Sequence, residues 1–514
     1  MLSHRLSHFT ITVSVTRRAF STLPTKGLIK LKSKNLLSIK GPDSTKFING
    51  LITSKLLPSF TKKNQTTISE QDLKELQNSK SLDITESQIT DSNWGMIHED
   101  EYVDDDDESE EHAFRLGIRR DGRFSMLLNS KGRLISDLFV YPTPLSVPEA
   151  DLKEGNVSDP SYLIEFNNMA KFNQSLMMLK LHKLKSKIDI RPKLIESWFY
   201  FNRENDKFDD LLTQIKDNYF NNAISKSPSE ANKLASKFIT DQSIFNQQQQ
   251  NNILGFAIDD RASNFGIRFL KTPETKIDTV FSDKFISEFG QPEIHKLDTY
   301  ETLRVSEGIV ESSDYPKSKA DSMLPFENNV DFMGGINYNK GCYVGQELTI
   351  RTYYSGVVRK RVLPVQFYLI GKDGKVGEQD EINFDPNDGV VELISGVDDL
   401  ELVAAEDEKG GSSSTKSDTE DATATVMASS PFGGSGKKPV RARRRRKRSE
   451  GSVFKVDGNL GFATLNLNSL KDDNSVGVNE FIVNSDSHPE FKGKVGCKVY
   501  IPEWWPEGFN EDEE

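Results

Sequence analysis

Two long segments of this chain cannot bury a hydrophobic core, and they constrain how the rest can fold. The first runs from about residue 61 to residue 111, is polar, and ends in Glu99 to Glu111, where ten of thirteen residues are acidic. The second, from about residue 406 to residue 452, is of low complexity and rich in Gly, Ser and Thr. Dense like charge and a shortage of apolar side chains both oppose packing, so we expect two disordered insertions.

The second insertion also holds a basic run, ARRRRKR, from Ala442 to Arg448. Such a run is typical of a nuclear localisation or RNA-binding patch, but also of a solvated loop. The formal net charge of the chain is −12, which argues against a general nucleic-acid binder because phosphate neutralisation needs a surplus of Lys and Arg. We therefore favour the loop.

The ordered part of the chain changes character near residue 361. Before it, strand-like runs such as Ser161–Phe166 alternate with helical ones such as Met169–Lys185, which indicates an α+β region. Asp121-Gly122 lies between two apolar runs and predicts a hairpin turn. After residue 361 the pattern consists of short strands, including VVELIS at residues 390–395, which suggests a small β-barrel.

The first residues have the composition of a mitochondrial transit peptide. Residues 1–42 contain no Asp or Glu but many Lys and Arg, and an acid-free basic segment is attracted to an inside-negative potential. We expect residues 1–20 to be the transit peptide, with cleavage after Phe20. No stretch approaches the roughly 20 consecutive apolar residues of a membrane span.

The chain has two cysteines, Cys342 and Cys497, which exclude a disulfide framework and suggest a reducing compartment. There is no Cys-x-x-Cys pair, and an iron–sulfur cluster usually takes four thiolates. Any cluster would therefore be shared with a partner or a small thiol. The chain also lacks G-x-S-x-G, P-loop and G-x-G-x-x-G motifs, so serine hydrolase, nucleotide hydrolase and dinucleotide enzyme functions have no support.

Cys342 lies in the segment KGCYVGQE, where Gly341 and Gly345 permit tight backbone geometry and close approach of a ligand. Lys340 precedes the thiol, and several basic residues follow it, so we expect a thiolate suited to metal ligation, redox chemistry or nucleophilic attack. Gln346 and Glu347 can orient a polar heterocycle through paired hydrogen bonds. The basic residues that follow are Arg351, Arg359, Lys360 and Arg361.

The chain resembles the YgfZ branch of the GcvT superfamily, whose members are relatives of the folate-dependent aminomethyltransferase of glycine cleavage. KGCYVGQE is similar to the signature of that branch, and further matching segments span nearly all of the chain outside the leader and the insertions. Those segments are LLSIKGPDSTKFINGLITSKL, KGRLISDLFVY, DDRASNFGIR, LRVSEGIVES, LPFENNVDFMGGINYNKG and TIRTYYSGVVRKR.

The resemblance implies an α+β, multi-domain, folate-binding fold with a C-terminal β-barrel. It divides the chain into a folate-binding region at 27–360 and a barrel at 361–514. Asp137 and Arg304 are the implied folate-pocket residues, and tetrahydrofolate the implied cofactor. The signature residues carried over are Lys340, Gly341, Cys342, Tyr343, Gly345, Gln346 and Glu347.

Together with the leader, the resemblance implies a mitochondrial matrix factor for the maturation of [4Fe–4S] proteins. The implied partners are A-type iron–sulfur carriers, which would share a [4Fe–4S] or [2Fe–2S] cluster transiently with Cys342, and client enzymes of the aconitase and lipoate synthase types. Two alternatives are a folate-dependent one-carbon transferase and a non-catalytic adaptor with a vestigial pocket. Ser136 and Ser306 stand where aminomethyltransferases tend to carry acids, which weakens the case for the transferase.

Overall fold

The computed structural model describes residues 23–57, 97–101, 115–146, 159–204, 206–220, 228–316, 323–338, 340–371, 382–404, 449–470, 479–491 and 493–506. The predicted transit peptide and most of both predicted insertions lie outside these residues. Within the acidic segment, however, β3 (Ile97–Glu101) pairs antiparallel with β4 (Arg115–Arg119). The expectation of disorder is wrong for these five residues, because their backbone pairs with β4 in a ladder that charge density alone does not reveal.

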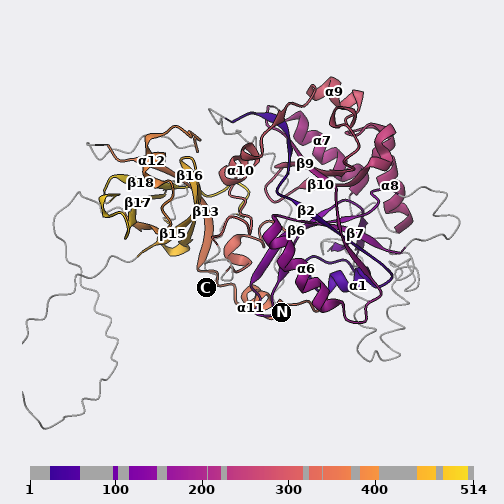
Figure 1. The fold of residues 1–514 in the computed structure, drawn as a ribbon, viewed down its shortest axis with the longest axis horizontal. Coiled ribbons are helices and arrows are strands. Elements are labelled where there is room, and N and C mark those ends of the chain that lie inside the picture. The colour runs from indigo at the N-terminus through magenta and orange to yellow at the C-terminus, as the bar shows by residue number, and fades with distance from the viewer. Residues whose placement is uncertain are drawn as a thin grey trace, which may run out of the picture.

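Two five-stranded sheets form the body of the molecule (Figure 1). The first has the order β10-β11-β9-β1-β12 and is antiparallel except between β1 and β12. Its strands are β1 (Lys26–Lys30), β9 (Glu196–Asn202), β10 (Ile253–Asp259), β11 (Gly266–Lys271) and β12 (Ile294–His295). The second is antiparallel, with the order β5-β6-β7-β2-β8. Its strands are β2 (Asn35–Lys40), β5 (Arg123–Leu128), β6 (Leu134–Pro142), β7 (Ser161–Phe166) and β8 (Asp189–Lys193).

Helices cover the outer face of each sheet, and a shared core fills the space between the sheets. In β1, Leu28 packs among the helices on the first sheet, and the next residue, Ile29, packs into the shared core. In β2, Leu36 faces the shared core and Leu37 faces the helices of the second sheet. The period of two explains why these strands are apolar on both faces. The helices are α7 (Lys207–Ile215), α8 (Pro228–Thr240) and α9 (Asp283–Phe289) on the first sheet, and α1 (Ser44–Asn49) and α6 (Met169–Lys183) on the second.

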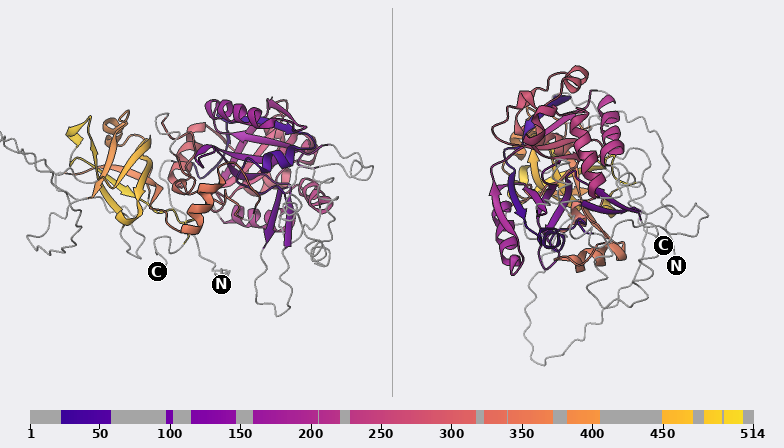
Figure 2. Two further views of the ribbon diagram at one scale, coloured as in Figure 1. Left: turned by 90° about the horizontal axis from the view of Figure 1, so that it is seen from below. Right: turned by 90° about the vertical axis from the view of Figure 1, so that its right-hand side faces the viewer.

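A closed barrel with the order β13-β16-β15-β14-β17-β18 follows helices α10 (Leu297–Ser306) and α11 (Gln346–Ser355) and lies beside the body (Figure 2). The expected α+β class and C-terminal β-barrel are thus confirmed. Barrel residues Val362 and Phe462 also join the shared core of the body. The strands are β13 (Lys360–Leu369), β14 (Leu400–Ala404), β15 (Gly451–Asp457), β16 (Leu460–Asn466), β17 (Asn479–Ser485) and β18 (Val495–Val499).

Two local predictions are wrong. The segment VVELIS forms helix α12 (Gly389–Ile394), because the Asp388 side chain caps its first turn and Val390 and Ile394 bury one helical face. Asp121-Gly122 is no hairpin turn, since β4 pairs with β3 and β5 pairs with β6. The amide of Gly122 instead donates to the Phe256 carbonyl at 2.6 Å, so this turn contacts the first sheet.

The remaining helical turns are short and connect these elements. They comprise a π-helix (Lys216–Phe220) and the 3-10 helices Gln247–Asn252, Ile277–Thr279, Phe326–Asn328, Leu467–Ser469 and Pro489–Phe491. Within the described residues, none of the helices has both the length and the apolar character needed to cross a membrane.

Candidate functional site at the KGCYVGQE segment

The side chain of Lys340 anchors the segment before the cysteine. Its ammonium group is buried and donates to the carbonyl oxygens of Asn49, Ile52 and Ser54 at 2.8, 2.5 and 2.7 Å. These carbonyls lie at and after the end of α1, where a helix presents acceptors without backbone partners. Burial and the nearby Lys55 lower the pKa of Lys340, whereas the three acceptors favour its charged form.

Gly345 anchors the segment on the other side of the cysteine. Its φ of +82° lies in the left-handed region, and a Cβ there would stand 2.5 Å from the Asn129 carbonyl oxygen. Asn129 belongs to the β5–β6 turn, where its side-chain oxygen accepts from the amides of Lys131 and Arg133. Val344 adds a backbone hydrogen bond to the Gly50 carbonyl at 3.1 Å. The signature glycine therefore lets the loop lie directly against the body.

Between these anchors Cys342 is exposed, whereas Cys497 is buried. Cys497 lies on β18 in the barrel core, fully enclosed, and burial raises the pKa of its thiol. Within the described residues no group of three or more His, Cys, Asp or Glu side chains could hold a metal ion. Cys342 is thus the one cysteine of this chain that an external partner can reach.

Three of the five basic residues expected to activate the thiol have partners elsewhere. Lys340 binds the carbonyls described above, Arg351 pairs with Glu347 at 2.7 Å, and Arg361 pairs with Asp331 at 2.8 Å. The Lys340 side chain thus anchors the segment to the end of α1. Its expected effect on the thiol of Cys342 stays a prediction.

Signature residues also line an open groove of about 690 Å³. Tyr343, Gly345, Gln346 and Glu347 contribute to its wall, together with Ser130 of the β5–β6 turn. Glu347 is exposed and already paired with Arg351, so the expected joint action of Gln346 and Glu347 on a heterocycle stays a prediction. The groove shows that these four signature residues share one accessible surface.

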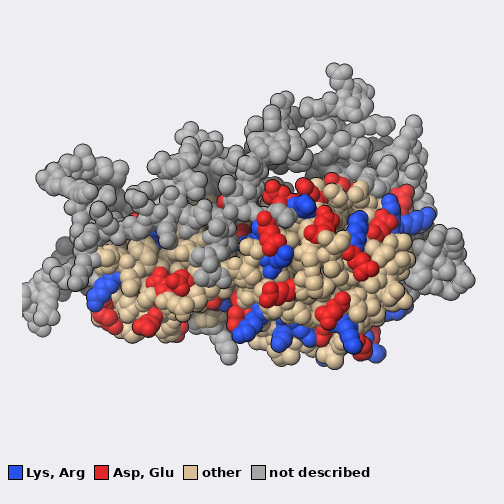
Figure 3. All heavy atoms as spheres, turned by 90° about the horizontal axis from the view of Figure 1, so that it is seen from above, with Lys and Arg blue, Asp and Glu red and all other residues tan. Residues whose placement is uncertain are grey.

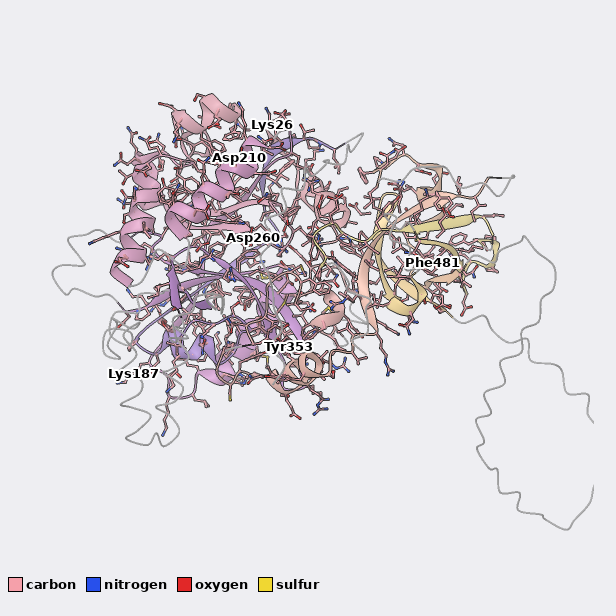
Figure 4. All side chains as sticks on the ribbon, turned by 180° about the vertical axis from the view of Figure 1, so that it is seen from behind. Lys26, Lys187, Asp210, Asp260, Tyr353 and Phe481 are labelled. Carbon is pink, nitrogen blue, oxygen red and sulfur yellow. The ribbon has the colours of Figure 1, made fainter. Side chains whose placement is uncertain are left out.

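Two tyrosines beside this surface were not singled out by sequence reasoning as a pair. The rings of Tyr338 and Tyr353 stack with their centroids 3.8 Å apart, and Tyr354 stands edge-on to Tyr353 at 5.4 Å. Figure 4 shows Tyr353 on α11 at the lower margin of the body. Because the stacked pair comes from two segments, only their proximity in the fold reveals it.

The two predicted folate residues lie in the core between the sheets. Both carboxylate oxygens of Asp137 accept from the Asn167 amide at 2.6 and 2.5 Å, and one also accepts from the Ser312 backbone amide at 2.9 Å. Arg304 donates to Asp314 at 2.6 and 2.8 Å and to the Ile309 carbonyl. Both side chains are 3% exposed or less and bonded within the protein.

These residues belong to a larger buried network centred on Glu311. Glu311 pairs with Lys34 at 2.7 Å and Arg261 at 3.0 Å, and it accepts from the Tyr300 hydroxyl at 2.8 Å. Burial acts to raise the pKa of Glu311, but Lys34, Arg304 and Arg261 outweigh it and hold that pKa well below its usual range. A tetrahydrofolate ring would have to displace these internal partners, so Asp137 and Arg304 do not fit a folate pocket in this structure.

Comparisons with known proteins identify the family. No protein-family model matches the chain. The chain is 37% identical over 499 residues to the iron–sulfur cluster assembly factor IBA57 homolog, mitochondrial, of Debaryomyces hansenii, covering 94% of this chain and 99% of that protein. The chain belongs to the IBA57 family. The family member of Candida albicans is 37% identical over 506 residues, with the same coverage of both chains. The Saccharomyces cerevisiae IBA57 is 32% identical over 361 residues, 65% of this chain and 67% of that protein.

Membership of the IBA57 family confirms the expected resemblance to mitochondrial iron–sulfur cluster assembly factors, and with it the mitochondrial location. A solved structure of the glycine cleavage system aminomethyltransferase T from Bartonella henselae gives a TM-score of 0.44 at 8% identity, covering 94% of this chain and 87% of that one. At that score it adds nothing to the assignment. The transit peptide, the link to YgfZ and folate binding stay predictions.

Proposed function

We propose that this chain works in the mitochondrial matrix on the maturation of [4Fe–4S] proteins, and that Cys342 is its ligand to a cluster in transit. The observation that carries the proposal is the exposed thiol of Cys342 on a loop anchored by Lys340 and Gly345. One thiolate supplies one of the four ligands that a cluster usually takes. The cluster is therefore a cargo, and a carrier protein of the A type supplies the other ligands.

The clients that we propose are aconitase-type enzymes and radical enzymes such as lipoate synthase. In a strain that lacks the protein, aconitase activity and lipoylation should fall while [2Fe–2S] enzymes keep their activity. A defect confined to glycine cleavage would favour the one-carbon transferase instead. Ser136 and Ser306 do not support that alternative, because each hydroxyl donates to a nearby backbone carbonyl and neither is an acid.

The thiol's role is tested by returning Cys342→Ser and, as the matched control, Cys497→Ala to the deletion strain. Cys342→Ser should fail to restore aconitase activity and lipoylation, whereas Cys497→Ala should restore them if the barrel still folds. Full rescue by Cys342→Ser would remove cysteine ligation from the proposal. Anaerobic purification with the carrier should show a cluster absorption band that Cys342→Ser abolishes or shifts.

Tetrahydrofolate binding is a separate proposal that rests on the family resemblance alone. Asp137 and Arg304 are engaged with other residues, so we assign no step to the ligand. Titration of the purified protein with tetrahydrofolate, followed by intrinsic fluorescence, measures binding directly. The absence of saturable binding in a preparation that restores aconitase would favour the adaptor with a vestigial pocket.

A further inference from the structure

Helix α6 carries apolar side chains on two opposite faces. Phe172 and Leu179 are buried against the second sheet. Met177 and Leu181 are 66% and 65% exposed, and their spacing of four residues places them on one stripe of the helix. Leu184, which directly follows the last residue of the helix, is 87% exposed. A helix that covers one sheet needs one apolar face. The exposed stripe therefore does not pack against that sheet.

The surroundings of this stripe are strongly basic. Lys180 lies three residues after Met177, hence on the same side of the helix. From Lys180 to Lys193 the chain has six basic residues and one acidic residue, a formal net charge of +5 in a chain whose net charge is −12. On the face shown in Figure 3, by contrast, described acidic and basic side chains are interspersed. The basic residues are Lys180, Lys183, Lys185, Lys187, Arg191 and Lys193.

The placement of this surface leaves it accessible. Helix α6 covers the outside of β6 and β7 (Figure 1), and the chain then runs to β8, the edge strand of the second sheet. Figure 4 shows Lys187, in that connection, at the margin of the body and well away from Phe481 of the barrel. Lys180, Lys185 and Lys187 are all exposed.

We propose that the exposed face of α6, together with the connection that follows it, binds a bilayer that carries anionic phospholipids. We call this the α6 surface (Met177, Lys180, Leu181, Leu184 and Lys187). A helix with Leu and Met on its outer face and flanking lysines lies in the interface of such a bilayer, with the apolar side chains among the acyl chains and the lysines beside the phosphates. The exposed side chains protrude from the helix, as insertion requires. The protein is held at the membrane surface without spanning it.

The composition of the α6 surface favours a lipid partner over a protein. Protein interfaces draw their affinity from Trp, Tyr and Arg and are depleted in Lys at their core. The α6 surface contains Leu, Met and Lys and no aromatic residue. Its high density of positive charge complements a layer of phosphates directly.

The experiment is co-sedimentation of the full chain with vesicles of phosphatidylcholine alone or of an equimolar mixture with phosphatidylglycerol. We expect binding to the mixed vesicles only, weakened by added salt. The pair Lys180→Glu and Lys187→Glu should lower the partition coefficient by about tenfold or more, because each basic residue near an anionic surface contributes about 1 kcal/mol. The matched control is Lys233→Glu with Lys237→Glu, which makes the same charge change on exposed positions of α8.

The contribution of the apolar side chains to vesicle binding is tested with Leu181→Gln. The control is Leu393→Gln, which changes a half-exposed leucine on α12. Leu181→Gln should weaken binding at every salt concentration, and Leu393→Gln should leave it unchanged. Circular dichroism confirms that each variant is folded. Equal losses of vesicle binding in the α6 and α8 charge variants would overturn the proposal. Vesicle binding that survives both the charge change and the Leu181→Gln change on the α6 surface would also overturn it, and would point to another basic segment such as Ala442–Arg448. Absence of vesicle binding altogether would also overturn it and leave a protein as the partner.

Discussion

The thiol groups of Cys342 and Cys497 lie in contrasting environments. Cys342 is exposed on the anchored loop, and Cys497 is enclosed by the barrel core, where burial raises its pKa. A thiol reacts through its thiolate, so access and ionisation act in the same direction on Cys497. Chemical reactivity should therefore distinguish the two residues in the folded protein.

Labelling with a maleimide at neutral pH should modify Cys342 rapidly and leave Cys497 unmodified until the protein is unfolded. Mass spectrometry of the digested protein locates the label. Prior unfolding in guanidinium should make both sites reactive. Labelling of Cys497 in the native protein at a rate similar to that of Cys342 would contradict the enclosed position described here.

Lys340 determines whether the loop stays in place. In Lys340→Met, three carbonyl oxygens lose their donor while the buried charge is removed, and we expect a loss of about 2 kcal/mol in the free energy of unfolding. Urea denaturation measures this loss. Protease cleavage near Cys342 should also accelerate, because the loop loses an anchor. Arg351→Met, which removes an exposed ion pair, is the control and should cost less than about 1 kcal/mol.

At the scale of elements, the docking of helix α11 on the β5–β6 hairpin depends on close contact between glycines. Gly345 precedes the helix and approaches the Gly132 Cα, so that a Cβ on Gly345 would be 3.1 Å from it. A Cβ on Gly132 would in turn stand 2.7 Å from Leu348 on α11. The hairpin and the helix come from distant parts of the sequence. They can pack this closely only because Gly132 and Gly345 have no Cβ.

Gly345→Ala should destabilise the protein by more than Gly356→Ala. The Gly356→Ala variant is the control, because it introduces the same kind of backbone strain without a steric contact of the new Cβ. Both glycines have a positive φ, +82° and +65°, but a Cβ on Gly356 meets nothing within 4 Å. We expect about 1 kcal/mol for Gly356→Ala and about 3 kcal/mol for Gly345→Ala, since the latter adds overpacking to strain. Thermal and urea denaturation of the two variants give the comparison. Equal losses of stability in the two variants would show that the close contact of Gly345 with the β5–β6 turn does not contribute to stability.

At the scale of the whole molecule, the buried ionic network joins parts that also share the apolar core. Asp137 comes from the second sheet, Asp259 from the first, Arg304 from α10, and Lys455 of the barrel pairs with Asp314 at 3.2 Å. Burial acts to raise the pKa values of Asp259 and Asp314, but Arg261 and Arg304 respectively outweigh it and lower them. Ionised carboxylates thus contribute to the association of the parts.

The network predicts loss of stability in acid. A carboxyl group whose pKa is lower in the folded than in the unfolded protein stabilises the fold above the unfolded value of about 4, and this contribution disappears as the pH falls toward the folded value. The free energy of unfolding should hence decline below about pH 4. Glu311→Gln should cost about 3 to 5 kcal/mol at neutral pH, because it leaves Lys34 and Arg261 uncompensated, and should flatten the acid decline.

Glu347→Gln is the control for this prediction, because it removes an exposed pair within one helix and should cost less than about 1 kcal/mol. Denaturant titrations from pH 3 to pH 7 compare the two variants with the parent protein. An unchanged pH profile in Glu311→Gln would show that other carboxyl groups govern the acid decline.

The sequence alone determined the family, the class of fold and the limit that two cysteines set on cluster binding. These follow from local patterns: strand periodicity, the KGCYVGQE segment and a count of thiols. Local patterns failed at Asp121-Gly122, where the strands on either side pair with other strands and not with each other. They also failed at VVELIS, where the cap by Asp388 and the burial of one helical face produce a helix.

Only the tertiary structure decided which groups the signature residues contact. The acceptors of the Lys340 ammonium lie 286 to 291 residues earlier in the chain, so its spacing from Cys342 could not reveal them. The enclosure of Asp137 and Arg304 likewise depends on partners from separate strands and loops. Hydrogen bonds and burial are set by distance in space, and the sequence records distance along the chain.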